Sequence, residues 1–258
     1  QKQNNFKDAI KTYNEIEVES LTKEQKLEYN YKLGYCYFNN GELATSKSYF
    51  SAVKDTRSKY SSPSTYYYAH ILYSEKDNNA ALKEFKDLRN DRNFKGIVPY
   101  YIAQIYYIQE KYSELVKQAE ELSQSSNSKR TEETNRMLGE AYCKLERYQE
   151  AIPYLEKGVK DNPSASAEDN YLLGYTYCRI EKYQEAIPYL SKAIGNKDSL
   201  SQNALYNIGY CYLKTGDKTS ARSSFQEAYS LDFDPQIKED ALLNFAKLSY
   251  DLPNPFNE

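Results

Sequence analysis

The sequence predicts an all-α fold, an α-solenoid in which antiparallel helix pairs stack on one another. Two observations carry this prediction. Residues 147–159 recur, with few changes, 35 positions later as residues 182–194. Apolar residues return at helical spacing for about a dozen positions and then restart after a short polar turn. Because one helix pair cannot bury its apolar face alone, neighbouring pairs must stack.

A small residue marks the first helix of each predicted pair, and we call it the marker residue. The markers recur at intervals of 34 to 37 residues: Gly34, Ala69, Ala103, Gly139, Gly174, Gly209 and Ala246. Twelve positions after a marker stands a second, usually small residue: Ser46, Ala81, Leu115, Ala151, Ala186 and Ala221. Small residues on facing helices let two backbones approach closely. These positions therefore predict tight crossings between the two helices of a pair.

The predicted repeats form one solenoid of about seven helix pairs. In chain order they cover residues 1–20 (partial), 22–60, 62–93, 96–128, 131–163, 166–198, 201–233 and 235–258 (partial). The first segment reads as a second helix without its first. Phe256 begins a copy of the repeated motif that then stops. We interpret the chain as a segment of a longer repeat protein, with a natural end in a degenerate repeat as the alternative.

Helix starts and turns agree with this division. Residues 22–25 (Thr-Lys-Glu-Gln) read as a capping box. Ser62 and Asp234 each precede a Pro and predict a cap residue followed by Pro at the first helical position. Residues 39–41 and 215–217 contain Gly and predict the turns inside two of the pairs.

Composition excludes several classes of protein. Hydrophobic residues make up 40% and charged residues 28% of the 258 positions, which is typical of a globular chain. The net charge is -3 without a block of like charges, so no nucleic-acid-binding surface is indicated. The most apolar run, residues 100–108, is far shorter than the roughly 18 residues that a membrane span needs.

No catalytic, metal or cofactor site is predicted. The four Cys (Cys36, Cys143, Cys178 and Cys211) form no CxxC pair, and no His clusters with them. Each lies in a predicted helix, where a free Cys behaves as a small hydrophobe. The one His, His70, has no ligand-spaced partner, and no nucleophile elbow or phosphate loop is present. We therefore expect a protein that is not an enzyme.

These features together resemble the tetratricopeptide repeat family. The matches are the Leu-Gly-x-x-Tyr of the first helices, the Ala and the Phe or Leu of the second helices, and Pro163 closing one repeat. The resemblance covers essentially the whole chain and is weaker in the repeats marked by Ala69 and Ala103. The family's Trp-like position holds other residues: Asn30, Thr65, Pro99, Asn135, Asn170 and Leu205.

The resemblance implies helix pairs wound into a right-handed superhelix, with a concave groove that binds a peptide or protein partner and no catalysis. Positions three before, one after and four after each marker share one helix face, and in the family this face lines the groove. Tyr fills 11 of these 21 positions. The predicted partner-binding residues are Tyr31, Tyr35, Tyr66, His70, Tyr73, Tyr100, Gln104, Tyr107, Arg136, Glu140, Tyr171, Tyr175, Tyr206 and Tyr210.

The role of this Tyr face stays open between recognition and packing. Tyr offers large contact area, few rotatable bonds and a polar tip, which suits recognition. Tyr is also the commonest core filler in this chain, so the same residues could pack between first helices. Few of the positions carry charge, so partner binding is expected to depend only modestly on salt. One subset of the family, the carboxylate clamps, carries Lys, Asn and Arg on this face. Only Arg136 and Lys247 match those residues in charge type, which argues against a carboxylate clamp here.

The best-supported function is a protein-interaction scaffold. The alternatives are a glycan-binding helical-repeat protein of the cell envelope, which the absence of Trp argues against, an enzyme whose active site lies outside this segment, and self-assembly through the groove or the solenoid ends. The resemblance is closest to bacterial repeat proteins, many of which are exported to the periplasm or envelope. Four unpaired Cys favour a reducing compartment such as the cytoplasm instead, so the compartment stays open.

Overall fold

The computed structural model describes residues 2–123, 128–160, 162 and 164–251. Within these ranges the chain forms helices and no strand, so the predicted all-α fold is confirmed. Pro163 and the motif that begins at Phe256 lie outside the described residues. The chain divides into two compact units, residues 1–109 and 110–258.

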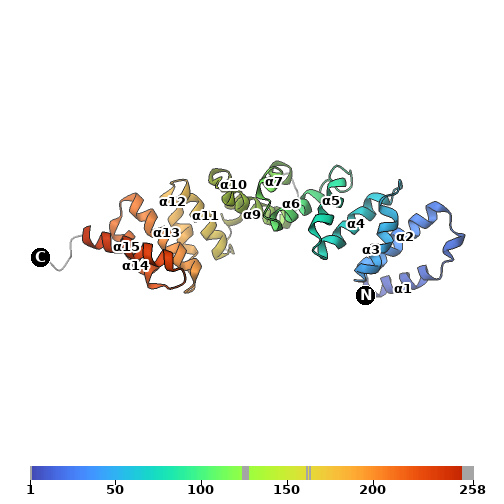
Figure 1. The fold of residues 1–258 in the computed structure, drawn as a ribbon, viewed down its shortest axis with the longest axis horizontal. Coiled ribbons are helices and arrows are strands. Elements are labelled where there is room, and N and C mark those ends of the chain that lie inside the picture. Colours follow the sequence, from blue (N-terminus) through green and yellow to red (C-terminus); the bar gives the residue numbers. More distant parts are fainter. Residues whose placement is uncertain (1, 124–127, 161, 163, 252–258) are drawn as a thin grey trace. The chain divides into compact units, whose positions relative to one another are not determined.

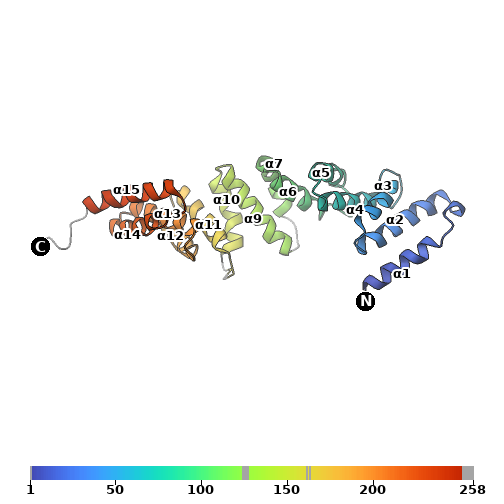
Figure 2. The same cartoon turned by 60° about the horizontal axis from the view of Figure 1, so that its bottom comes forward.

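In the first unit, the helices lie one after another in chain order (Figure 1). Its helices are α1 (Lys2–Asn14), the 3₁₀ turn η1 (Val18–Ser20), α2 (Lys23–Asn39), α3 (Leu43–Lys54), α4 (Ser61–Ser74), α5 (Asn78–Asp87) and α6 (Val98–Ile108). Each helix packs against the next, and α2 also contacts α4. Figure 2 shows α1 running back alongside α2. Stacking of first helices is thus present in this unit.

The second unit repeats the same arrangement more regularly. Its helices are α7 (Tyr112–Val116), α8 (Ala119–Ser123), α9 (Ser128–Lys144), α10 (Tyr148–Val159), α11 (Ala167–Arg179), α12 (Tyr183–Lys192), α13 (Ser199–Thr215), α14 (Lys218–Ser230) and α15 (Pro235–Asp251). From α9 onward each helix packs on the next, and α9, α11, α13 and α15 also touch in series. This is a helical repeat solenoid. Around Leu115 the predicted second helix is instead two short helices, α7 and α8.

The glycine markers lie at close helix crossings, as predicted, but the partner side chain differs. A Cβ on Gly34 would lie 3.0 Å from the Cβ of Tyr49, and one on Gly209 would lie 2.9 Å from the ring of Phe225. The nearest side chain is therefore the large residue fifteen or sixteen positions after the marker. In the first of these pairs, the small residue twelve positions after the marker forms a hydrogen bond with the backbone of the facing helix: Ser46 Oγ donates to the Gly34 carbonyl at 2.8 Å.

The turn inside each pair places one residue in the left-handed region, seven positions after every marker from Gly34 to Gly209. Gly41 and Gly216 occupy it in the two predicted Gly turns, with φ of 85° and 87°. The same position is held in the other pairs by residues with a side chain: Lys76, Glu110, Glu146 and Glu181. A left-handed residue at this point ends a helix, and Gly has no Cβ to oppose it. The turn geometry therefore repeats even where the sequence gives no Gly.

The predicted helix caps are confirmed at two of three places. Thr22 and Gln25 form the full capping box at the start of α2. Asp234 Oδ1 accepts from the amides of Gln236 and Ile237 at the start of α15. The prediction for Ser62 was wrong, because α4 begins at Ser61, two residues before the predicted first position, with Tyr60 at the cap position.

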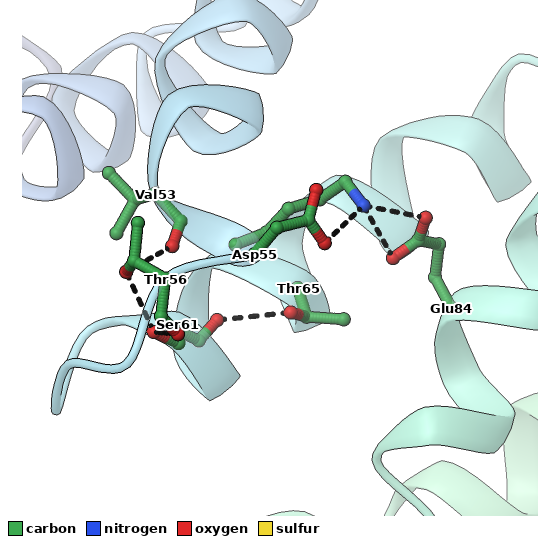
Figure 3. A network of polar contacts seen from close by, with 7 residues as sticks. Val53, Asp55, Thr56, Ser61, Thr65 and Glu84 are labelled. Atoms are coloured by element: carbon green, nitrogen blue, oxygen red, sulfur yellow. Dashed lines mark hydrogen bonds and ion pairs between the residues drawn. The ribbon is translucent and has the colours of Figure 1, made fainter.

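Ser61 instead takes part in polar contacts that tie the segment after α3 to α4, beside a separate ion pair that ties α3 to α5 (Figure 3). Its hydroxyl donates to the Thr56 carbonyl at 2.5 Å, and Thr65 Oγ1 donates to the Ser61 carbonyl at 3.1 Å. On the adjoining side, Lys54 Nζ lies 3.0 Å from Glu84 Oε1, and both side chains are 13% exposed. Shielded charges are tolerated when they are paired. The pair therefore holds α5 to the end of α3 within the first unit.

Candidate functional site

The predicted partner-binding residues fall into two groups, one in each unit. We call the group on α2, α4 and α6 the N-terminal aromatic face: Tyr31, Tyr35, Tyr66, His70, Tyr73, Tyr100, Gln104 and Tyr107. The group on α9, α11 and α13 is the C-terminal aromatic face: Arg136, Glu140, Tyr171, Tyr175, Tyr206 and Tyr210. None of the fourteen is buried; Arg136 and Tyr210 are exposed and the rest are half-buried. The residues therefore keep surface available for contact.

Other Tyr residues have a packing role that repeats along the chain. In the pairs marked by Gly34, Gly139 and Gly174, the Tyr three positions after the marker stacks on a Tyr of the second helix: Tyr37 on Tyr49, Tyr142 on Tyr154 and Tyr177 on Tyr189, with ring centroids 5.5, 5.6 and 5.8 Å apart. Such contacts add to the area that the rings bury. The Tyr excess is therefore divided between these pairs and the aromatic faces.

Two residues missing from the prediction anchor the N-terminal aromatic face to the core. Tyr67 stacks on the fully buried ring of Phe50 at 5.2 Å, and Tyr101 stacks on the fully buried ring of Phe85 at 5.1 Å. Burial raises the pKa of Tyr67 to about 12. Both residues stand two positions before a marker, three residues from a predicted position, so a wider helix face would have included them.

Polar pairs also cross the N-terminal aromatic face. Tyr73 donates to Gln104 Oε1 at 3.3 Å, and Gln104 Nε2 donates to the Tyr100 hydroxyl at 2.9 Å. His70 Nε2 lies 2.9 Å from the Tyr101 hydroxyl. Side chains on α4 and α6 are therefore joined at the surface, and this face is preorganised.

Protonation of His70 should destabilise the first unit. Burial lowers the pKa of His70 below its ordinary value of 6.5. The unfolded chain then binds more protons than the folded chain as the pH falls below about 6.5, so the free energy of unfolding decreases with falling pH until the folded-state pKa is passed. We expect the melting temperature of the wild type to fall more between pH 8 and pH 5 than that of His70→Gln. Parallel pH profiles would show that His70 carries no such linkage.

On the C-terminal aromatic face, a groove of about 600 Å³ brings four of the six predicted residues together. Arg136 and Glu140 come from α9, and Tyr171 and Tyr175 come from α11. The two Tyr rings stack at 6.0 Å, and Tyr148 from α10 meets Tyr175 edge-on at 6.2 Å. The groove therefore has one aromatic wall built from two helices.

The lining of this groove includes Cys143, which lies on the predicted helix face but was not among the predicted binding residues, and further residues outside that face: Lys144, Glu146, Tyr148, Glu168, Asp169, Leu172 and Leu200. Tyr148 starts a second helix and so lies outside the predicted positions, which are all on first helices. Burial raises the pKa of Tyr171 to about 12, against the opposing effect of its hydrogen bond with Asn207. Tyr171 and Tyr175 are both half-buried, so each keeps part of its surface on the groove.

Tyr206 and Tyr210 do not line the groove. Tyr206 packs edge-on against the buried ring of Phe225 at 5.6 Å. Tyr210 is 36% exposed and contacts Tyr183 at 6.1 Å, with Lys214 Nζ 5.2 Å from its ring centroid. Of these two residues, Tyr206 supports the core and Tyr210 presents a surface.

The cysteines behave as small helix residues. Cys36, Cys178 and Cys211 are buried, Cys143 is half-buried, and all four are free thiols. Cys143 Sγ lies 3.1 Å from Thr176 Oγ1, and burial raises the pKa of the Cys143 thiol. Among the described residues, no three His, Cys, Asp or Glu side chains come close enough to hold a metal ion. In the same ranges, no helix is both long and apolar enough to span a membrane.

Comparison with known proteins starts from family models. One model described as tetratricopeptide repeat matches residues 136–199 and 171–236, and another with the same description matches residues 27–59. Together these matches cover just over half of the chain. No curated protein sequence matches the chain.

Solved structures of repeat proteins share the fold. YrrB, described as a TPR protein with an unusual peptide-binding site, is 19% identical with a TM-score of 0.58, and the match covers 70% of this chain and 91% of YrrB. The C-terminal part of a TPR repeat-containing protein from Cytophaga hutchinsonii is 20% identical with a TM-score of 0.58, covering 93% and 96%. MamA from Desulfovibrio magneticus RS-1 is 18% identical with a TM-score of 0.51, covering 66% and 94%. At these identities the likeness concerns the fold alone, and the family matches add the assignment: the chain belongs to the tetratricopeptide repeat family.

Proposed function

We propose that this chain is a protein-interaction scaffold that binds an extended or helical peptide segment of a partner protein on its aromatic faces. Tetratricopeptide repeats are typically non-catalytic scaffolds. The similar structure YrrB is described as having a peptide-binding site, which supports the same class of ligand here. The repeat division given by the sequence is part of this proposal, since it places the aromatic faces on successive first helices.

The groove between α9 and α11 is the observation that carries the proposal. Its wall of Tyr171, Tyr175 and Tyr148 offers aromatic area, and charged side chains surround it. Aromatic anchors at the centre of an interface contribute most of the binding energy in many complexes. A volume of about 600 Å³ is enough for a few side chains of a bound peptide.

The choice between recognition and packing differs from residue to residue. Tyr31 lies 6.2 Å from the buried ring of Phe50, and Tyr206 lies 5.6 Å from Phe225. Truncating either ring would disturb the core. The ring contacts of Tyr175 and Tyr210 are with other surface or half-buried side chains instead. These two residues are therefore the better probes of binding.

Replacing Tyr175 and Tyr210 together by Ala should weaken peptide binding by about 2 kcal/mol or more, if they are binding hot spots, which is roughly a thirtyfold increase in Kd. The ligands are peptides selected from a random peptide library on the wild-type chain, and Kd is measured by calorimetry. The matched control is Phe233→Ala, which removes an aromatic ring that is 50% exposed and lies outside the aromatic faces.

Thermal melts of the same variants separate the two roles of Tyr. Recognition predicts a nearly unchanged melting temperature and a large loss of affinity. Packing predicts a sharp fall in melting temperature, as truncation of buried aromatics produces. A stable double variant that keeps the wild-type affinity, or a wild type that selects no peptides, would contradict the proposal.

A further inference from the structure

We infer that the groove between α9 and α11 binds a cationic side chain, Lys or Arg, of the partner peptide. This inference rests on the proposed function and names the chemistry of its ligand. Three features of the groove lead to it: the charge of its lining, the faces of its aromatic rings, and the cation that already lies beside those rings.

The charge of the lining is negative. Four carboxylates border the groove, from Glu140, Glu146, Glu168 and Asp169. Only Arg136 and Lys144 bring positive charge to the same lining, and Arg136 Nε already lies 3.7 Å from Asp169 Oδ1. With four carboxylates against two cationic side chains, the lining carries a net negative charge, which favours ligands of positive charge.

The aromatic wall favours the same kind of ligand. A cation is attracted to the face of a Tyr ring when it lies within about 6 Å of the ring centroid. The guanidinium of Arg179 lies 5.1 Å from the centroid of Tyr148 and 5.9 Å from that of Tyr175. These two rings therefore hold a cation of the chain itself, and the carboxylates of the adjoining groove would hold a second one from the ligand.

Other peptide chemistries fit the lining less well. An acidic segment would bring like charges next to the four carboxylates, which costs affinity. A purely apolar segment would bring no charge to a lining that is net negative, so burial of the carboxylates would cost desolvation without adding an attraction. A Lys or Arg between apolar residues satisfies both parts of the site, because its charge meets the carboxylates while its neighbours cover the rings.

The inference changes one expectation drawn from the sequence. The predicted groove positions contain few charges and indicated modest salt dependence. In the structure, Lys144, Glu146, Glu168 and Asp169 also border the groove. Because exposed charges are screened by salt, peptide binding at the C-terminal aromatic face should weaken clearly as ionic strength rises. The predicted residues of the N-terminal aromatic face carry no acidic or basic group other than His70, so they give no reason to expect this charge preference there.

The test is a selection from a random peptide library on the full chain, followed by Kd measurements on the selected peptides. We expect the selected peptides to be enriched in Lys and Arg over the input library. Replacing the central basic residue of a selected peptide by Gln should weaken binding several-fold, and replacement by Glu should weaken it further. The variant Glu140→Gln/Glu168→Gln should also bind these peptides several-fold more weakly. The matched control Glu227→Gln makes the same kind of change on exposed α14 surface and should bind like the wild type.

A third variant reports the sign of the ligand charge independently. Arg179→Gln removes a positive charge beside Tyr148 and Tyr175, so it should tighten binding of a basic peptide and weaken binding of an acidic one. Peptides that depend on Tyr175 but show no basic enrichment, or that bind more weakly to Arg179→Gln, would overturn this inference and leave the proposed function standing. Absence of any peptide that depends on Tyr175 would overturn both. Melting curves confirm that each variant is folded.

Discussion

Gly174→Leu should destabilise the second unit strongly, and even Gly174→Ala should lower its stability by about 1–3 kcal/mol through overpacking. A Cβ at this position would lie 2.7 Å from Leu190 Cγ and 2.8 Å from the backbone nitrogen of Leu190. The backbone atom cannot move away by a change of rotamer, so α11 and α12 must separate. Ala is favoured over Gly in a helix by about 1 kcal/mol, so a net loss would show that the crossing outweighs helix propensity.

Gly158→Ala is the matched control for this prediction. Gly158 lies inside α10, and a Cβ there would meet no atom within 4 Å. The same substitution should therefore stabilise the protein by roughly 0.5–1 kcal/mol through helix propensity alone. Urea unfolding of both variants gives the comparison. Changes of the same sign in the two variants would mean that the crossing at Gly174 is not tight.

The marker residues show which features of the fold the periodicity of the sequence can predict and which it cannot. Their spacing predicted the helix pairs, and the close approach at Gly174 is present in the structure. The predicted small partner Ala186 does approach Gly174, but through its backbone, because spacing tells which positions face each other and not which side chain fills the contact. Leu190 reaches across to Gly174, whereas Ala186 contributes a backbone oxygen that would lie 3.1 Å from the added Cβ.

The candidate site was predictable where it lies on the periodic first helices. The positions counted from each marker included Tyr171 and Tyr175, which share one groove with Arg136 and Glu140. It could not find Tyr148, because that residue belongs to a second helix and reaches the groove only through the way α10 packs against α11. Whether a residue of a second helix lines the groove depends on tertiary packing, which helical periodicity does not describe.

The left-handed turns illustrate another limit. Gly41 and Gly216 allowed their turns to be predicted from the sequence. Glu146 and Glu181 adopt the same left-handed backbone region, although Glu at these positions does not predict it. What is constant is the distance of seven residues from the marker to the turn, so α9 and α11 end at the same point relative to their markers. The position seven residues after the marker therefore adopts a left-handed conformation whether Gly, Lys or Glu occupies it.

The buried side chain of Gln202 is a further feature that periodicity does not reveal. No other repeat has Gln at the position seven residues before its marker. The Gln202 side chain is fully buried in α13 and holds the loop between α14 and α15. Nε2 donates to the carbonyls of Ala228, Leu231 and Asp234 at 3.3, 2.9 and 3.3 Å. Oε1 accepts from the amides of Phe233 and Asp234 at 3.2 and 2.7 Å.

Gln202→Met should therefore destabilise the second unit by about 2–4 kcal/mol, since each buried polar group left without a partner costs roughly 1–3 kcal/mol. Met has similar length and fills the space, so the loss reports hydrogen bonds rather than a cavity. Gln226→Met, at an exposed position of α14, should change stability by less than about 0.5 kcal/mol. Urea unfolding measures both, and hydrogen exchange adds a local readout, because the amides of Phe233 and Asp234 should exchange faster once their acceptor is gone. Unchanged stability together with unchanged exchange at these amides would show that the loop is held by other contacts.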